Sequence, residues 1–426
     1  MKQRQASVPI LMVSMIAVML GFGIVIPLMP FYITHFNASG TALGLIMSIY
    51  SLMQFITAPF WGKMSDRFGR KPIFMIGLAG FAISFILQGL AQNLVQFVIL
   101  RTLAGVLSSA TFPTAMAYIA DTTTPEHRSK GVGMLGASMG LGMVIGPSLG
   151  GLITHLSLPL PGSIQALMQI TQDTATGETL NLSLPFFAAA LLALVALPLA
   201  QFLLPESLPP EKRSLHTPAK AQQSRLSSLL HAAKGPVGLL YILAFVLAFA
   251  LANMEAVLSL YGKEQFKMGP AEIGLLMGAM GLLSVIQQGF TLGFLTRKFG
   301  EAAIVRSGLF ISALGFVGMA LAPVRWLFIG FALFFNTGSV LLQPSVTALI
   351  SKRTRGGQGE AMGINNAFQA LGRSVGPTWA GMAYDMYSTL SFWTGALIQF
   401  GALLFSLRGL AEENTAQAAR VEEAQS

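Results

Sequence analysis

The densest charged stretch of this chain runs from Gly62 to Pro72, between two long apolar runs, and reads GKMSDRFGRKP. An acid at Asp66 can interact with the positive N-terminal end of a facing helix. Arg67 and Arg70 can form ion pairs with acids elsewhere, while glycines permit close approach and a tight turn. A simple basic loop would need neither the acid nor the glycines. We therefore predict a water-exposed turn that acts as a conformational latch, formed by Gly62, Asp66, Arg67, Gly69, Arg70 and Asp121.

Three charged residues lie inside apolar runs, where a charge is costly and therefore suggests a function. Glu255 could take up a proton on one side of a membrane and release it on the other, or it could form a structural ion pair or reach the outer interface. Arg373 lies deep enough to pair with Glu255, and protonation would break that pair. Arg101 could extend to the interface, order a water-filled path, or hold an anion or a carboxylate. These three residues form the predicted proton-coupling group.

Long apolar helices must position these residues. Of the 426 residues, 53% are hydrophobic and only 10% are charged, so the chain cannot cover itself with a polar surface. Runs of about 20 apolar residues can cross a bilayer as helices. Twelve such spans are predicted, at residues 8–33, 41–61, 72–91, 97–120, 132–155, 184–204, 236–261, 271–295, 302–322, 326–350, 361–384 and 388–408. The predicted fold is all-α and integral to the membrane.

The basic residues set the expected orientation. Most of the 26 Lys and Arg residues lie in the tails and in the loops at one end of the spans. Because basic residues mark the cytoplasmic side, we expect both termini to be cytoplasmic, in a multi-pass protein of the bacterial plasma membrane. The formal net charge of +9 then reflects membrane orientation, and no nucleic-acid partner is expected.

Landmarks in the first half of the chain return about 230 residues later. The repeated landmarks are residues 62–69 and 293–300, residues 146–151 and 376–381, and Pro113 and Pro344. Two parallel six-helix halves are therefore predicted, with a substrate site between them near the midplane. The predicted divisions are a first half at 1–204, a cytoplasmic linker at 205–235, a second half at 236–408 and a cytoplasmic tail at 409–426. Arg297 stands where the first copy has Asp66, which predicts a weaker second latch.

Several motifs together resemble the major facilitator superfamily, in particular its twelve-helix drug:proton antiporters. Residues 62–72 match the superfamily's loop between helices 2 and 3, and residues 20–30, LGFGIVIPLMP, resemble the helix-1 signature of the antiporters. Leu100-Arg101-x-x-x-Gly105 resembles their helix-4 motif, and residues 142–151 resemble the helix-5 motif of exporters. The resemblance implies a rocking transporter whose loop between helices 2 and 3 steadies the outward-open state.

The helix-5 motif has a physical basis of its own. Glycines spaced four residues apart line one face of a helix and let a partner helix approach closely. A proline among them can bend the helix. We predict a thin, bendable interface between the halves, although ordinary small-residue packing would have the same pattern. The motif residues are Gly142, Gly146, Pro147, Gly150 and Gly151.

The resemblance also implies a coupling residue and a cavity. Residues 254–261 resemble span 7 of Gram-positive quinolone and multidrug efflux pumps, which carry an acid at the position of Glu255. Those pumps have a second acid in span 10, which residues 340–344, VLLQP, lack. The cavity should be lined by spans 1, 4, 7 and 10, where aromatic and methionine side chains suit variable ligands. The predicted lining residues are Phe22, Tyr32, Phe112, Met116, Phe249, Met254, Phe335, Asn336 and Gln343.

Other classes of function lack the residues that they need. The chain has no phosphate-binding GxxxxGK[ST] loop, no cysteine and no metal-binding spacing of histidines and carboxylates, so neither an enzyme, a cofactor nor a metal is expected. We predict a monomeric, proton-coupled exporter of amphipathic small molecules or drugs. The alternatives are an exporter of one metabolite or sugar, a lipid-linked glycan flippase, a solute importer and a non-transporting scaffold. The external segment 156–183 could be a lid or a disordered insertion.

Overall fold

The computed structural model describes residues 7–425 with the exception of 157–160, 162–167, 173–176, 178, 214–228, 230, 236 and 355–356. Its helices pack as two compact units. Unit 1 comprises Met1–Ala219 and Leu258–Gly281, and unit 2 comprises Lys220–Val257 and Leu282–Ser426. Each unit is described by itself below.

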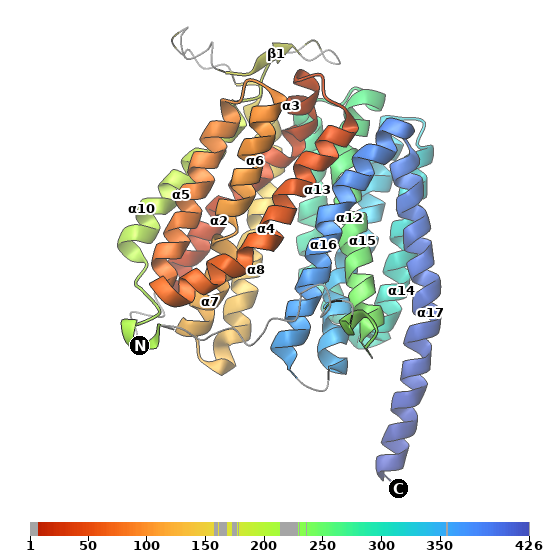
Figure 1. Cartoon of the computed structure of the whole chain (residues 1–426). Coiled ribbons are helices and arrows are strands. Elements are labelled where there is room, and N and C mark those ends of the chain that lie inside the picture. Colours follow the sequence, from red (N-terminus) through yellow and green to blue (C-terminus); the bar gives the residue numbers. More distant parts are fainter. Residues whose placement is uncertain are drawn as a thin grey trace. The chain divides into compact units, whose positions relative to one another are not determined.

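Unit 1 is a helical bundle with a short hairpin at one end, which we call the hairpin end (Figure 1). Its elements are α2 (Ser7–Val25), η1 (Ile26–Leu28), α3 (Met29–His35), α4 (Gly40–Phe68), α5 (Arg70–Gly89), α6 (Leu94–Ser108), α7 (Thr111–Thr122), α8 (Pro125–Ile153), β1 (Ile170–Gln172), β2 (Thr179–Asn181), α10 (Leu184–Leu203), η2 (Pro210–Lys212) and parts of α12 (Gly238–Phe266) and α13 (Pro270–Ile286). Aromatic side chains of α3, α6 and α10 pack together inside it, at Tyr32, Phe97 and Phe186.

Prolines divide two of the predicted spans. Pro27 and Pro30 fall where the first span changes from α2 through η1 to α3. Pro113 lies in the first turn of α7, where the fourth span is interrupted between α6 and α7. A proline has no N–H to donate to the preceding turn, so the helix breaks or changes pitch at these points.

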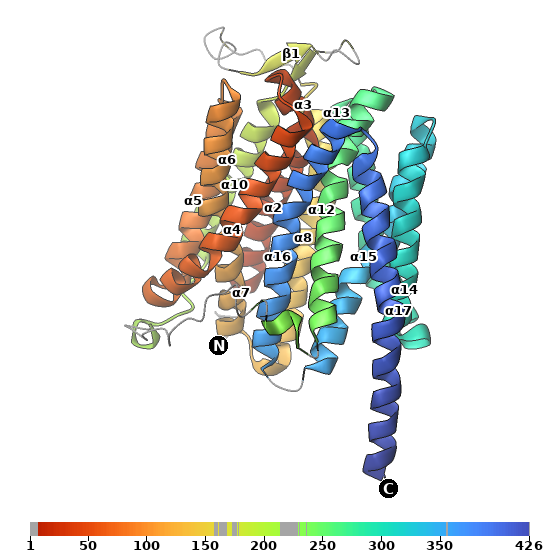
Figure 2. The ribbon, with the colours of Figure 1, turned by 45° about the vertical axis from the view of Figure 1, so that its right-hand side comes forward.

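Unit 2 contains the remainder of α12 and α13 and the helices that follow them (Figure 2). These elements are the π-helical turn η3 (Gln287–Thr291), α14 (Leu292–Leu321), α15 (Arg325–Arg353), α16 (Gln358–Met386) and α17 (Leu390–Gln425). α17 continues beyond its predicted span to Gln425. Its helix projects past the others of unit 2 in Figure 2.

All twelve predicted spans are helical. Ten helices among the described residues are long and apolar enough to cross a membrane. One of them, Pro270–Leu321, is 52 residues long and contains two predicted spans, which a non-helical Gly300 separates. The remaining span, α16, is less apolar because it carries Asn365, Asn366 and Arg373. The predicted all-α membrane fold is therefore confirmed.

The described parts of segment 156–183 form an anchored hairpin at the hairpin end. β1 pairs antiparallel with β2. The N–H of Asn181 donates to the carbonyl of Thr154 at 2.8 Å, and Oγ of Ser183 donates to the carbonyl of Gly89 at 2.6 Å. These bonds fix β2 and the residue that precedes α10 to the helices, and β1 is held by its pairing with β2, so the described residues are not a disordered insertion. The rest of the segment lies outside the described residues.

Candidate functional site

The charged stretch 62–72 is not an open loop. α4 continues to Phe68 and α5 begins at Arg70, so Gly69 alone makes the turn. Gly69 has a φ of 107°, and an added Cβ would lie 2.3 Å from Oε2 of Glu206. Only glycine suits both conditions. Gly62 has no such role here, because an added Cβ would meet nothing within 4 Å.

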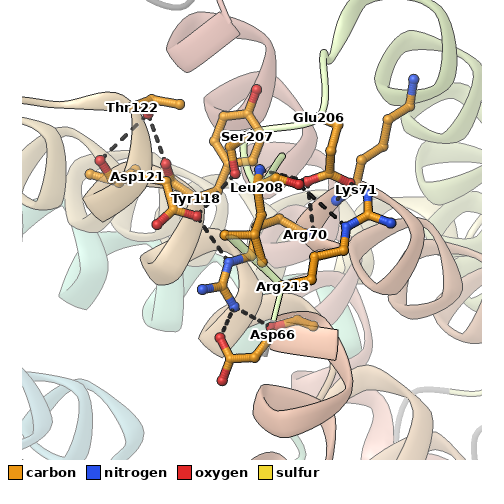
Figure 3. Close-up of polar contacts among 12 residues, drawn as sticks. Asp66, Arg70, Lys71, Tyr118, Asp121, Thr122, Glu206, Ser207, Leu208 and Arg213 are labelled. Carbon is orange, nitrogen blue, oxygen red and sulfur yellow. Dashed lines mark hydrogen bonds and ion pairs between the residues drawn. The ribbon is translucent and has the colours of Figure 1, made fainter. Parts of the chain in front are cut away.

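Arg70 joins the ends of two helices at this turn (Figure 3). Its side chain is 10% exposed. Nη1 lies 2.6 Å from Oδ1 of Asp66 and donates to Oγ of Ser65 at 2.7 Å, both on α4. Nε donates to Oδ2 of Asp121, at the end of α7, at 3.0 Å. The predicted pairing of Arg70 with Asp121 is present.

The other two charged members of the predicted latch are more exposed. The side chain of Asp66 is 49% exposed, and its carboxylate lies against Arg70. Arg67 is exposed, and its guanidinium lies 5.2 Å from the ring centroid of Phe68. In the described part of the chain Arg67 thus contacts an aromatic ring and forms no ion pair, unlike Arg70.

Glu206, which sequence reasoning missed, completes this cluster. Its carboxylate accepts the N–H of Arg70 at 2.9 Å and that of Lys71 at 3.3 Å, so it caps the start of α5. An acid is favourable there because the first N–H groups of a helix have no partner within the helix. Ser207 donates to Oδ2 of Asp121 at 3.1 Å. The beginning of the predicted linker is therefore fastened to the latch, and the available signal was an acid directly after the sixth apolar run.

Replacing Glu206 by alanine is expected to lower the free energy of unfolding by about 0.5–2 kcal/mol, the usual range for a lost helix cap. Two N–H groups of α5 would lose their acceptor, so the amides of Arg70 and Lys71 should exchange hydrogen faster. Glu206→Gln keeps an acceptor without the charge and should lie between the two. Glu211→Ala, at an exposed acid of the same segment, is the matched control. Unchanged exchange at both amides would refute the cap.

The second repeat carries the same pair with its charges reversed. Glu301 stands where the first repeat has Arg70, and Lys352 stands where it has Asp121. Nζ of Lys352 donates to Oε1 of Glu301. Gly300 precedes this pair with φ 77° and ψ 162°, again a left-handed turn. The Lys352 side chain is 64% exposed, against 24% for Asp121, so the second pair is the less buried one.

The glycines of the helix-5 motif bring α8 against α2. An added Cβ would come within 2.5, 2.7 and 2.0 Å of the α2 backbone at Gly142, Gly146 and Gly150, respectively. The predicted close approach is present. The partner of these three glycines is the first helix of the same predicted half, whereas Gly151 contacts Pro270, which belongs to the predicted second half.

A second face of α8 contacts α13 within unit 1. An added Cβ at Gly151 would lie 2.3 Å from the carbonyl oxygen of Pro270, and one at Gly274 would lie 2.3 Å from that of Pro147. Ser148 donates to the carbonyl of Gly274 at 3.2 Å. Sequence reasoning missed the small-residue spacing that permits this contact on α13, at Gly274, Gly278 and Gly281.

A buried lysine fastens α12 to α3 nearby. Lys263 is 9% exposed. Its Nζ donates to Oγ1 of Thr34 and lies 4.7 Å from the ring centroid of Phe31. Residues 258–281 follow the predicted linker in the sequence, yet they pack with the first unit. These contacts of α8 and α3 account for that assignment.

Arg101 lies in a polar and aromatic cluster between the helices of unit 1. It is 3% exposed. Its Nη1 donates to Oε1 of Gln88 at 3.3 Å, and its guanidinium carbon lies 4.4 Å from the ring centroid of Tyr50 and 5.9 Å from that of Phe22. Of the alternatives left open for this residue, a side chain extended to the interface does not fit this burial.

Glu255 and Arg373 lie in unit 2, on α12 and α16. Arg373 acts electrostatically on Glu255, although the two form no direct ion pair in the described part of the chain. Glycines beside Arg373 allow the helices to approach: an added Cβ at Gly372 or Gly376 would come within 2.5 or 2.6 Å of an α12 carbonyl oxygen. The structure thus brings the predicted pair together without direct contact.

The predicted cavity residues differ in how deeply they are buried. Tyr32 and Phe335 are fully buried among other aromatic rings, so they pack inside the bundles instead of facing open space. Phe112 is 42% exposed. The others are buried or half-buried: Phe22, Met116, Phe249, Met254, Asn336 and Gln343. Two of these bond polar partners in unit 2, where Asn336 donates to Ser284 at 3.1 Å and Gln343 to Gln369 at 3.0 Å.

Comparisons with known proteins agree with this architecture. A sequence model of the Major Facilitator Superfamily matches residues 11–377. Multidrug resistance protein 2 of Bacillus subtilis (strain 168) is 29% identical over 88% of each chain. Tetracycline resistance protein, class C, of Escherichia coli is 30% identical over 90% of this chain and 91% of the relative.

Solved structures share the fold at lower identity. A bacterial homologue of the human lysosomal transporter Spinster superposes with a TM-score of 0.74 at 14% identity, over 96% of this chain and 97% of that one. A D-xylose–proton symporter superposes with a TM-score of 0.71 at 19% identity, over 94% and 97% of the two chains.

Proposed function

Since the chain belongs to the Major Facilitator Superfamily, and is therefore a multi-pass secondary transporter of the bacterial plasma membrane, we propose that it exports amphipathic small molecules in exchange for protons. The observation that carries the proposal is Glu255, an acid on an apolar helix within electrostatic reach of Arg373. A protonated glutamate would release Arg373, and a charged one would attract it. Relatives named for multidrug and tetracycline resistance support the export of drugs.

The transport cycle would then involve two features of unit 1, the Arg70 cluster and the contact of α8 with α13. We propose that the Arg70 cluster is a cytoplasmic latch and that the α8–α13 contact closes the outer side. Small residues on both α8 and α13 suit an interface that must separate and re-form, because few side chains need to repack.

The test is uptake of a cationic dye, ethidium, into inside-out vesicles with an imposed proton gradient. We expect uptake by the wild type that a protonophore abolishes, and loss of that uptake in Glu255→Gln. Glu264→Gln, at an exposed acid of the same helix, is the matched control and should retain uptake. Exchange of labelled for unlabelled dye without a gradient should survive in Glu255→Gln, because that reaction moves no net proton.

Full proton-driven uptake in Glu255→Gln would refute this residue as the proton carrier and direct attention to Asp66 and Asp121. Absence of any dye uptake, with protein present in the membrane, would contradict drug export and favour an exporter of one metabolite or a lipid-linked glycan flippase.

A further inference from the structure

We propose that Arg101 and the side chains around it anchor the anionic group of an amphipathic substrate, so that the transporter prefers organic carboxylates and zwitterions to cations of the same shape. The inference rests on the proposed function, since it names the substrate class of the same transporter.

Among the described residues, Arg101 has no carboxylate to neutralise it. The sequence contains no acid before Asp66 and none between Asp66 and Asp121. Both of these acids bind Arg70 at the opposite end of the helices. Sixteen residues of α4 separate Tyr50, which faces Arg101, from Asp66, a distance of about 24 Å at the helical rise. Among the described residues, no acid lies within ion-pair distance of Arg101.

The groups that contact Arg101 replace a counter-ion only in part. The faces of Tyr50 and Phe22 attract a cation, and such contacts are stronger when they are desolvated. Gln88 adds one hydrogen bond at 3.3 Å. Removing a charged group from water has a free-energy cost that such contacts offset only in part. The cluster is therefore short of negative charge, and binding of an anion would stabilise it.

The orientation of the guanidinium suits such an anion. Nη1 is directed at Gln88, whereas Nε is buried and has no hydrogen-bond partner among the described residues. Carboxylates bind arginine through two adjacent N–H groups, one of which can be this Nε–H. A buried donor without an acceptor destabilises the protein, and a bound carboxylate would relieve that cost.

The aromatic residues beside Arg101 would accommodate the apolar body of the substrate. Phe22 stacks on Tyr50 with ring centroids 5.3 Å apart. The hydroxyl of Tyr50 is already engaged, since it accepts from Ser108 at 3.0 Å and from Gln54 at 3.1 Å. The rings are thus held in place by their own partners. A planar apolar group attached to a carboxylate would find an aromatic surface next to the charge.

The test uses two dyes that differ in one group: rhodamine 19, which has a free carboxyl group, and rhodamine 6G, its ethyl ester. Binding to the purified full-length protein in lipid nanodiscs is measured by fluorescence polarisation. We expect the wild type to bind the acid at least about tenfold more tightly than the ester. Arg101→Gln should remove that ratio, and Arg101→Lys should keep part of it. Arg325→Gln, at an exposed arginine, should leave it unchanged.

A second variant separates binding from structure without removing Arg101. Gln88→Glu keeps the shape of the side chain and places a carboxylate beside Nη1. If Arg101 binds a substrate anion, this internal carboxylate should compete, and the preference for rhodamine 19 should fall by about the same factor. If Arg101 is only structural, neutralising it should stabilise the protein and leave the ratio of the two affinities unchanged, which would overturn the inference.

Proton-driven uptake of both dyes into inside-out vesicles distinguishes the two proposals. Uptake of rhodamine 6G without a preference for rhodamine 19 would retain the proposed function and overturn the anion anchor. Arg101-dependent binding of rhodamine 19 without any proton-driven transport would retain the anchor and overturn the proposed function. Absence of rhodamine 19 binding would overturn the anchor.

Discussion

Replacing Gly150 by valine is expected to abolish stable folding of unit 1, whereas the same substitution at Gly136 is expected to be tolerated. A Cβ at Gly150 would lie 2.0 Å from the carbonyl oxygen of Ile24. That oxygen belongs to the backbone of α2, so it cannot move aside as a side chain could. Overpacking costs about 1–3 kcal/mol where side chains can shift. Here two helix backbones, α2 and α8, would have to separate along their whole contact, so we expect a larger loss.

The measurement is thermal unfolding of the purified variants in detergent, together with the fraction that elutes as a single species. Gly136 lies on the same helix, and an added Cβ there would meet nothing within 4 Å. Its valine variant should differ from the wild type by no more than about 0.5 kcal/mol, as exposed substitutions usually do. Equal stability of the two variants would show that the contact of α2 with α8 is not close in solution.

The positions of the helices follow from the sequence because apolar runs of this length cross a bilayer as helices. The internal repeat can also be recognised in the sequence, and the structure supports the correspondence of residues about 230 positions apart. Gly300 has the same left-handed turn as Gly69, and Glu301 pairs with Lys352 as Arg70 does with its partner. An ion pair is equally attractive when the acid and the base exchange places. The second repeat therefore has an ion pair at these two positions although its residues differ from those of the first motif.

The partners of the motifs could not be predicted, because they depend on tertiary packing. Glycine spacing in α8 identifies a face that permits close approach, but it does not say that α2 covers that face. Glu206 was assigned to a linker because nothing local shows that the sixth span ends beside the start of α5. The predicted loop at 62–72 was wrong in extent for a different reason: charged residues such as Lys63 and Arg67 are good helix formers, and α4 continues through them.

Arg70→Glu is expected to be the most damaging charge reversal in the chain, and Asp121→Lys is expected to restore part of the loss. The single change would place a third carboxylate beside those of Asp66 and Asp121. It would also remove the donor that both of them accept from. Breaking a buried ion pair costs about 3–5 kcal/mol, and the 24% exposure of Asp121 favours the lower end of that range. The double variant reverses the pair with Asp121 as in the second repeat, but it leaves Asp66 beside an acid, so the recovery is partial. We expect a coupling energy above about 1 kcal/mol in a double-mutant cycle.

The matching reversal in unit 2, Glu301→Lys with Lys352→Glu, is the control for this cycle. Lys352 is 64% exposed, so water screens its pair, and each change should cost less than about 1 kcal/mol. The measurements are unfolding in detergent and proton-driven dye uptake for all six variants. Equal costs in the two units would contradict an asymmetric latch. If the costs differ as expected, two features explain the asymmetry. Arg70 pairs with both Asp66 and Asp121, whereas Glu301 pairs with Lys352 alone among the described residues, and Lys352 is the most exposed of these side chains.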